Sequence, residues 1–314
     1  MRTTIRLTLR QHRLGFTLVI AGCVILLLVG LAGAVLMELA GQAVCRDPMI
    51  GQQIETWTPA QVADLQARCE FSWAVPQVMT SIVSAGGNIL PLGAAVFLGA
   101  PIVAEEVETT TATLSWTLAR SRNAWYLPRM ALVMLACVGT ALVLGLLVDW
   151  AIGFLVQPFS PFGTLTQVYQ RGLLIPSRVA VTAASCLLAG ALVGRQVPAL
   201  VVGIALAALV GMGLHQLDDS INRSNARRFD GLGIGYAWIV IDRRDGRVVP
   251  DEEAYGGDIY PGDAAWEATY ESVAIGIPDS DAPLVIWRNV AFHGSATIVL
   301  LAASTVVVNR RRPY

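Results

Sequence analysis

The chain has 314 residues, of which 54% are hydrophobic and only 14% are charged, and its net charge is −1. A water-soluble domain carries about a quarter charged residues, so this composition excludes an ordinary soluble globule. All 22 basic residues are arginine, and without lysine the chain has no phosphate-binding P-loop, whose lysine reaches the β- and γ-phosphates of a nucleotide.

Long apolar runs predict six membrane-spanning helices. A helix needs about 20 mostly apolar residues to cross a hydrocarbon core that is roughly 30 Å thick. The first run is too long for the core of a signal peptide and is followed by further runs. We therefore predict an all-α polytopic membrane protein with spans at about 14–37, 78–100, 126–155, 176–193, 197–214 and 290–308.

The arginines predict the orientation of these spans. Basic residues in short loops are retained on the cytoplasmic side during insertion, which places both termini in the cytoplasm. We expect the protein to lie in the plasma membrane. The basic C-terminal tail is interpreted as a lipid-facing anchor and not as a nucleic-acid site. The arginines that fall inside are Arg2, Arg6, Arg10, Arg13, Arg120, Arg122, Arg129, Arg195 and Arg310–Arg312.

This topology leaves two long segments outside the cell, 38–77 and 215–289. In the second, which is acidic, β-rich stretches at 236–242 and 247–249 flank an Asp-Gly turn, which predicts a hairpin. We expect a small folded α+β cap between the fifth and sixth helices, which separates residues 1–214 from residues 290–314. Its aromatic side chains would form the core: Tyr236, Trp238, Tyr255, Tyr260, Trp266 and Tyr270.

The five cysteines divide between two environments. Cys23, Cys137 and Cys186 lie within predicted spans, where a cysteine acts as a small apolar side chain. Cys45 and Cys69 share the first outside segment, and an oxidising compartment favours a disulfide between them. Two free thiols are the alternative, and the spacing alone does not distinguish the two.

The segment that joins the second and third spans, residues 99–129, is polar enough to leave the membrane. No helix breaker interrupts residues 103–120, so we predict a short cytoplasmic helix within residues 101–125. Acidic residues at its start and basic residues at its end complement the helix dipole: Glu105, Glu106, Glu108, Arg120 and Arg122. Such a helix presents a handle to a cytosolic partner, and a plain solvated connector is the alternative.

The same segment has a regular pattern of residue types, G-A-P followed by two hydrophobic residues, A-x-E-x-E, a Trp-containing stretch and S-R-x-x-W. The residues that form it are Gly99, Ala100, Pro101, Ala104, Glu106, Glu108, Thr111, Trp116, Ser121, Arg122 and Trp125. This pattern resembles the permeases of type-2 ABC exporters, especially a group common in actinobacteria. The chain departs from it at Thr110, where glycine is usual, and at Arg129, near where lysine is common. Residues 9–14 also resemble the family's amphipathic entry segment, and residues 169–200 its fourth-to-fifth-span region.

The resemblance implies a permease subunit that exports its cargo and is not an enzyme by itself. A separate ABC ATPase subunit would bind ATP and Mg, and this chain would need no cofactor. Two permeases, either two copies or two related chains, would face each other in the lipid bilayer. Each would dock its coupling helix on an ATPase, through the residues Glu105, Glu106, Glu108, Thr111, Trp116 and Arg122. Since no span carries a charge array, an amphipathic small molecule, peptide or lipid-like cargo is favoured.

Polar and small residues within the spans suggest further roles. Asn88 lies toward the middle of its span and would either line a substrate path or form a hydrogen bond between helices. Asp149, near the predicted outer interface, is interpreted as an interfacial anchor in preference to a proton relay. Gly190 and Gly194 have the small-xxx-small spacing that favours close helix packing over a gate.

No metal or catalytic site is predicted. The histidines are dispersed, and metal binding would require His215 and His293 to meet a third ligand such as Asp218 or Asp219. The zinc motif His-Glu-x-x-His and the nucleophile elbow Gly-x-Ser-x-Gly are both missing from the sequence.

Two other classes of protein compete with a permease. One is a membrane-anchored sensor or assembly factor that acts through the acidic cap, and the coupling segment argues against it, because a passive anchor does not need one. The other is an intramembrane enzyme, against which the scarcity of catalytic residues within the spans argues.

Overall fold

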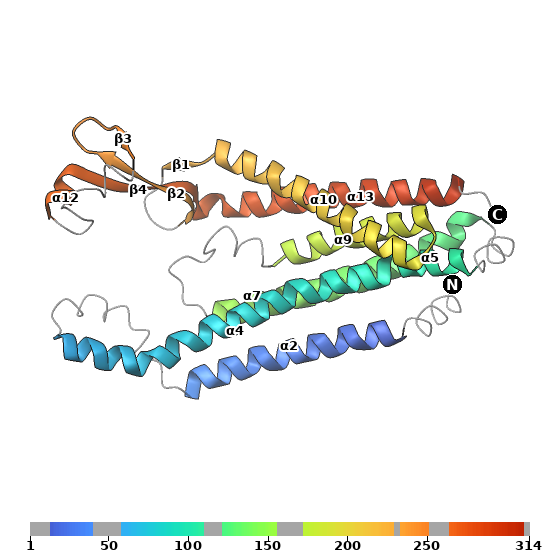
Figure 1. Ribbon diagram of the computed structural model, residues 1–314, viewed down its shortest axis with the longest axis horizontal. Coiled ribbons are helices and arrows are strands. Elements are labelled where there is room, and N and C mark those ends of the chain that lie inside the picture. Colours follow the sequence, from blue (N-terminus) through green and yellow to red (C-terminus); the bar gives the residue numbers. More distant parts are fainter. Residues whose placement is uncertain are drawn as a thin grey trace. The chain divides into compact units, whose positions relative to one another are not determined.

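The computed structural model describes residues 13–39, 58–109, 121–155, 172–228, 233–250 and 264–310, shown as ribbons in Figure 1. The chain divides into two compact units. Unit 1 consists of Met1–Gln157, Gln170–Gly213 and Val290–Tyr314, and unit 2 of Pro158–Tyr169 and Leu214–Asn289. Two long helices, α10 (Gln196–Ser224) and α13 (Ala282–Arg310), contribute one end to each unit.

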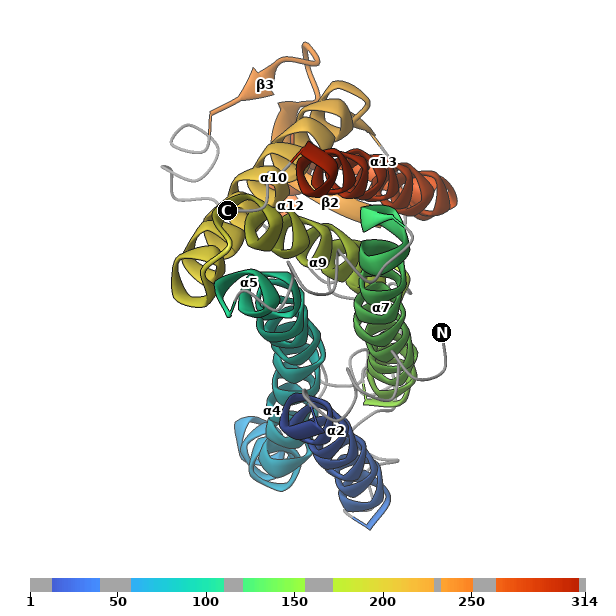
Figure 2. The same ribbon diagram turned by 90° about the vertical axis from the view of Figure 1, so that its right-hand side faces the viewer.

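Unit 1 is helical. Besides its parts of α10 and α13, it contains α2 (Arg13–Leu39), α4 (Pro59–Gly99), α5 (Pro101–Glu108), α7 (Arg122–Leu155) and α9 (Leu174–Val193). Helices α4, α7 and α9 pack against one another, and α2 packs against α4 and α7. Figure 2 shows this arrangement nearly along the helix axes.

Within the described residues, five helical segments are long and apolar enough to cross a membrane: Ser84–Glu108, Arg122–Trp150, Leu174–Val193, Gln196–Ser224 and Ala282–Arg310. They correspond to the predicted second to sixth spans, which confirms a polytopic, mostly helical membrane protein. The predicted first span is helical as α2, but its described apolar stretch, Val24–Gly33, is shorter than a span. A sixth span therefore stays a prediction.

The distribution of side chains in unit 1 is that of a bundle surrounded by lipid. Small residues such as Ala95, Ala141 and Ala183 are fully buried, whereas large apolar residues such as Leu135 and Val197 are at least 70% exposed. In a membrane the hydrophobic effect does not drive helices together, because the lipid tails are as apolar as the side chains. Small residues at the helix interfaces instead let the backbones approach closely. The bundle is therefore held together by close packing, and its apolar outer surface is suited to lipid.

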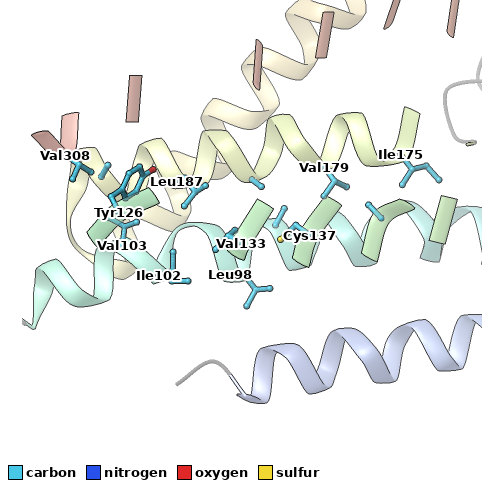
Figure 3. Close-up of a cluster of buried hydrophobic side chains, with 14 of the residues drawn as sticks. Leu98, Ile102, Val103, Tyr126, Val133, Cys137, Ile175, Val179, Leu187 and Val308 are labelled. Carbon is cyan, nitrogen blue, oxygen red and sulfur yellow. The ribbon is translucent and has the colours of Figure 1, made fainter. Parts of the chain in front are cut away.

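A continuous cluster of buried apolar side chains runs between α4, α5, α7 and α9 and reaches α13 (Figure 3). At one end of the cluster lie Val103, Tyr126, Leu187 and Val308. The hydroxyl of the fully buried Tyr126 donates a hydrogen bond of 2.8 Å to the hydroxyl oxygen of Ser304. This bond satisfies the only polar atom of a ring that is otherwise surrounded by apolar atoms, and it joins α7 to α13.

The segment predicted as a loop over residues 38–77 is helical from Pro59 onward, because α4 begins there. The start of α4 is a capping box: the Thr58 hydroxyl accepts from the Gln61 amide at 3.4 Å, and the Gln61 side chain accepts from the Thr58 amide at 2.8 Å. Proline at the first position supports the same start, because its missing N–H would have no helical partner there. Residues 40–57, which include Cys45, and the side chain of Cys69 lie outside the described part of the chain.

The helix predicted without a break over residues 103–120 ends at Glu108. The Thr109 hydroxyl donates 2.8 Å to the Glu105 carbonyl, and the consecutive threonines that follow are weak helix formers. The predicted start of the polar segment is also buried, since Ile102, Val103 and Ala104 face inward. Helix α5 therefore belongs to the bundle, and residues 110–120 lie outside the description.

Unit 2 contains a four-stranded antiparallel sheet with the order β1-β4-β2-β3. The strands are β1 (Arg227–Arg228), β2 (Gly233–Asp242), β3 (Val248–Val249) and β4 (Tyr270–Pro278), with the short helices α12 (Ala264–Thr269) and η3 (Asp279–Asp281) at the two ends of β4. The predicted hairpin is confirmed: Val240 pairs with Val249, and Gly246 in the turn has φ 71°.

The α+β composition predicted for residues 215–289 is also present, although helices reach further into this segment than predicted. Helix α10 continues to Ser224 and α13 begins at Ala282, so the strands occupy only residues 227–278. Trp266 packs with Val240 and Val249 in a small core, and its ring lies 5.7 Å from the ring of Tyr270. The side chains of Tyr236, Trp238, Tyr255 and Tyr260 lie outside the described residues. That unit 2 is an extracellular cap stays a prediction.

Candidate functional site

The candidate site is the pair of described flanks on either side of residues 110–120. The first flank is α5 with Thr109, and the second is Ser121 with the start of α7. Ser121 caps α7, because its hydroxyl accepts from the amide of Ala124 at 3.1 Å. Both flanks have a defined backbone, the first as α5 and the second as the capped start of α7.

Glu106 on α5 joins the two flanks. Its Oε1 accepts from Arg129 Nε at 2.9 Å, and its Oε2 accepts from Trp125 Nε1 at 3.0 Å. Trp125 and Arg129 lie four residues apart on α7, so they share one face of that helix. We call Glu106, Trp125 and Arg129 the anchor cluster.

The two α7 members of the anchor cluster, Trp125 and Arg129, also contact each other. Arg129 Nη1 donates to the Trp125 carbonyl at 2.8 Å, and the guanidinium lies 4.7 Å from the centroid of the Trp125 ring. The side chains of Arg129 and Glu106 are only 9% and 16% exposed. A cation over an indole ring is worth about 2 kcal/mol when it is desolvated, so the ring, the guanidinium and the carboxylate stabilise one another.

Glu108 makes a second connection from the first flank. Its Oε2 accepts from the amide of Gln196 at 2.9 Å, at the first residue of α10. Amides at a helix N-terminus have no partner within the helix, and a negative charge there is favourable for the helix dipole. Helix α5 is thus attached to α10 by a side chain that satisfies the start of α10.

The second flank is attached to the end of α13. Arg122 Nη1 donates to the carbonyl of Asn309 at 2.8 Å, one residue before α13 ends at Arg310. Carbonyls in the last turn of a helix have no helical partner, and a basic side chain near them is favourable for the helix dipole. Together with the bond from Tyr126 to Ser304, this contact fixes the first turns of α7 on α13.

Close contacts with α9 support the start of the first flank. A Cβ atom on Gly190 of α9 would lie 2.7 Å from the carbonyl oxygen of Ala100, and one on Gly99 would lie 2.9 Å from Cβ of Cys186. No side chain fits at either glycine unless the backbone moves. The packing role predicted for Gly190 is confirmed. Gly194 has a different role: it ends α9 with φ 66° in the left-handed region.

The structure places the predicted coupling residues in three different situations. Glu106, Glu108 and Arg122 contact other helices of unit 1, as described above. Glu105 is half-buried, and among the described residues its carboxylate has no hydrogen bond or ion pair. Thr111 and Trp116 lie outside the described residues.

Two members of the anchor cluster, Trp125 and Arg129, were not among the predicted coupling residues. Trp125 is part of the sequence pattern of this segment, and Arg129 is noted as a departure from it and as one of the predicted cytoplasmic arginines. Their four-residue spacing at the start of an apolar helix is a signal that could have identified them, because it places an arginine over an aromatic ring on one helix face.

The other predicted sites give little further chemistry. The Asn88 amide donates 2.8 Å to the Ser84 carbonyl in its own helix, and its two predicted roles stay predictions. No group of three or more histidine, cysteine, aspartate or glutamate side chains within the described ranges could hold a metal ion. Asp218, considered as a metal ligand, instead accepts from Arg288.

The helices and their apolar surface define the chain as a polytopic helical membrane protein. A family model described as ABC-2 membrane transporter related matches residues 16–217 of the 314, more than half of the chain. The chain belongs to this family. The predicted resemblance is thereby confirmed, and the chain is a transporter permease subunit that works with ABC ATPase subunits. No curated protein and no solved structure matches the chain.

Proposed function

We propose that this chain is the membrane-spanning half of an exporter and that residues 105–122 couple it to the ATPase. The observation that carries the proposal is the attachment of both flanks of residues 110–120 to the bundle. Glu106 and Glu108 connect the first flank to α7 and α10, and Arg122 connects the second flank to α13. A displacement of the intervening segment by a partner therefore acts on α5, α7, α10 and α13 of unit 1 together.

The proposal divides the predicted coupling residues into two groups. Glu106 is turned into the bundle and is mostly buried, so its role is to hold the two flanks together. Contact with the ATPase falls to Glu105 and to Thr111 and Trp116 in the intervening segment. A partner shifts a conformational equilibrium only by binding its two states with different affinity, and these residues would make the contacts that differ.

The remaining parts of the proposal follow from the sequence and the family. ATP and Mg bind to the partner, since this chain has no lysine for a P-loop. The permease acts as a pair, with a second copy or a related chain, in the plasma membrane and with both termini in the cytoplasm. The cargo is amphipathic or lipid-like, because no predicted span carries an array of charges that would select an ion.

We expect a gene for an ABC ATPase next to the gene of this chain. Co-expression of the two, followed by purification through a tag on the permease, tests the proposal. We expect the parent chain to retain the ATPase and to change its rate of hydrolysis. Trp116→Ala should lose the ATPase, whereas Glu106→Gln should retain it and lose the change in rate. Asp219→Asn, in a pair whose arginine, Arg223, is 72% exposed, is the matched control and should behave like the parent.

Two results would contradict the proposal. If Trp116→Ala retains the ATPase at the parental level, the intervening segment is not the docking element. If Glu106→Gln alters hydrolysis no more than Asp219→Asn does, the anchor cluster does not transmit the movement. Circular dichroism and gel filtration of each variant show whether a loss of binding reflects a loss of folding.

A further inference from the structure

Strand β1 of unit 2 has no buried side chain to fix its position on the sheet. It consists of Arg227 and Arg228, which pair with Gly276 and Ile275 of β4, and both arginines are exposed. The register of a strand is strongly specified where one of its faces is buried and weakly specified where it is polar on both sides. The neighbouring pair β2 and β4 is different, because its ladder runs the whole length of β2.

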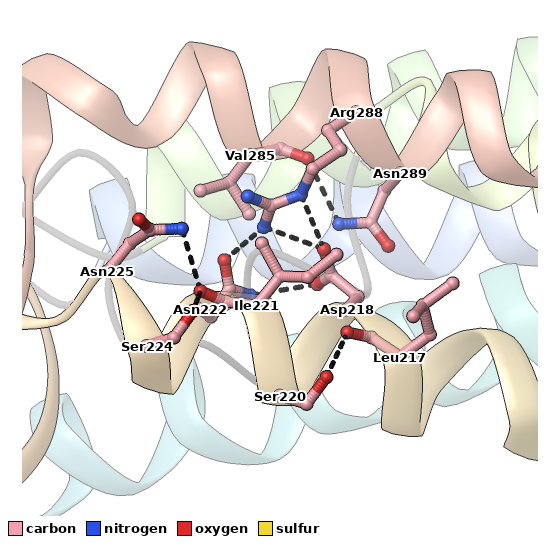
Figure 4. A network of polar contacts seen from close by, with 10 residues as sticks. All are labelled: Leu217, Asp218, Ser220, Ile221, Asn222, Ser224, Asn225, Val285, Arg288 and Asn289. Carbon is pink, nitrogen blue, oxygen red and sulfur yellow. Dashed lines mark hydrogen bonds and ion pairs between the residues drawn. The ribbon is translucent and has the colours of Figure 1, made fainter.

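The elements next to β1 and β4 carry a buried polar network. Helix α10 ends at Ser224, shortly before β1, and α13 begins at Ala282, directly after β4 and η3. Within unit 2, Arg288 of α13 donates from Nε and Nη2 to Asp218 Oδ1 of α10, at 3.0 and 2.7 Å (Figure 4). Asn222, one turn further along α10, donates to Asp218 Oδ2 at 2.8 Å and also contacts Arg288.

This network allows little freedom of position. Asp218 and Asn222 are fully buried, and Arg288 is 19% exposed. Both carboxylate oxygens of Asp218 are occupied, one by the guanidinium and the other by the amide. A buried ion pair adds little net stability over apolar side chains of similar volume, but a buried charge that loses its partner is strongly unfavourable. The network therefore favours one alignment of α10 on α13 over the neighbouring alignments.

The ion pairs that β1 itself makes with η3 and β4 are weaker than this buried network. Arg227 pairs with Asp281 at 2.8 Å, but the two side chains are 61% and 44% exposed. Arg228 pairs with Glu271, and both of these side chains are also exposed to a third or more. Exposed pairs of this kind contribute little, because water screens them and ordering the side chains costs entropy.

We propose that Asp218, Asn222 and Arg288 form a register clamp, which aligns the end of α10 with the start of α13 and thereby sets the pairing of β1 on β4. The clamp stays closed while the protein works, because opening it would leave Asp218 buried without its counter-ion. All of its residues lie in unit 2, so it is independent of the proposed coupling to an ATPase.

Engineered disulfides report the register directly. Residues directly opposite each other on antiparallel strands have Cα atoms about 4.5–5.5 Å apart, within the range of about 4.4–6.8 Å that a disulfide requires. Arg228→Cys with Ile275→Cys is the in-register pair, and Arg228→Cys with Val273→Cys is shifted by two residues on β4. Each pair is placed in a background free of the five native cysteines, and disulfide formation in the purified full chain is followed by mass spectrometry.

With the clamp intact, we expect a disulfide in the in-register pair and none in the shifted pair. Asp218→Ala should slow the in-register disulfide at least about tenfold and allow the shifted one. Arg288→Lys, which keeps the charge but loses the planar fork, should act in the same direction. The exchanged pair, Asp218→Arg with Arg288→Asp, should restore the in-register disulfide.

Asp219→Ala is the matched control, because Asp219 is the next residue and its pair with the 72% exposed Arg223 lies at the surface. It should leave both disulfides as in the parent. The proposal is overturned if Asp218→Ala and Arg288→Lys also leave both unchanged, since the sheet would then set its own register. It is equally overturned if Asp219→Ala has the same effect as Asp218→Ala. Arg288→Lys keeps the test decisive if Asp218→Ala does not fold.

Discussion

Replacing Arg129 by methionine tests whether the anchor cluster holds the two flanks of the coupling segment together. The substitution keeps an unbranched apolar side chain of similar length but removes the guanidinium. It thereby deletes the 2.9 Å ion pair with Glu106, the 2.8 Å bond to the Trp125 carbonyl and the cation over the Trp125 ring. The carboxylate of Glu106 then loses its bond from Arg129 and keeps its bond from the Trp125 indole.

The expected loss of unfolding free energy follows from the burial of the pair. Breaking a buried ion pair from one side costs about 3–5 kcal/mol. The side chains of Arg129 and Glu106 are 9% and 16% exposed, so water can partly solvate the charge on Glu106 that remains. We therefore expect a loss near the lower end of that range, about 3 kcal/mol.

A double-mutant cycle measures the interaction itself. Glu106→Leu alone should also be destabilising, because Arg129 would stay buried without its carboxylate, whereas the double variant should lose far less than the sum of the two single losses. The free energies are measured by titration with denaturing detergent in mixed micelles, followed by circular dichroism. The same cycle on Asp219 and the 72% exposed Arg223 should show a coupling of about 0–1 kcal/mol. Additive losses at Glu106 and Arg129 would refute the reasoning.

Three further substitutions test the packing of unit 1. Gly190→Val should destabilise the protein by about 1–3 kcal/mol, because its Cβ would lie 2.7 Å from the Ala100 carbonyl oxygen; an unchanged detergent midpoint would contradict this. Thr58→Ala should cost about 0.5–2 kcal/mol and reduce the helical signal through loss of the capping box, and an unchanged signal would show that the cap is dispensable. Tyr126→Phe should lower the free energy of unfolding by about 0.5–1.5 kcal/mol, because it removes the hydrogen bond to Ser304. The same titration measures this loss, and Ser304→Ala should lose a similar amount.

The sequence predicts the apolar helices well because their lengths are set by the thickness of the membrane. Their ends are less well predicted, since polar residues do not stop a helix that is properly capped. Helix α4 begins at Pro59, far ahead of the predicted start at residue 78, and Thr58 and Gln61 explain why. Helix α10 likewise extends to Ser224 and α13 begins as early as Ala282. Hydropathy does not predict these extensions, because they are polar helical turns beyond an apolar run.

The candidate site shows a second limit of prediction from sequence. The family pattern places Glu106 in the coupling segment and suggests an exposed handle, but the structure turns its carboxylate onto Trp125 and Arg129. Which acidic residue of a cluster faces inward depends on the packing of α5 against α9, and therefore on close contacts such as that of Gly190 with Ala100. No local pattern encodes a contact between residues so far apart in the chain.

The coupling claim is tested most directly by a photo-crosslinking amino acid at position 116 in the chain co-expressed with its ATPase. We expect a crosslink from this position to the ATPase, with a yield that changes when ATP is added. A photo-crosslinker at Arg244, on the exposed turn of the unit 2 hairpin, should give none. Absence of the crosslink at position 116 from a complex that nevertheless co-purifies, or an equal crosslink at position 244, would contradict the coupling of residues 105–122 to the ATPase.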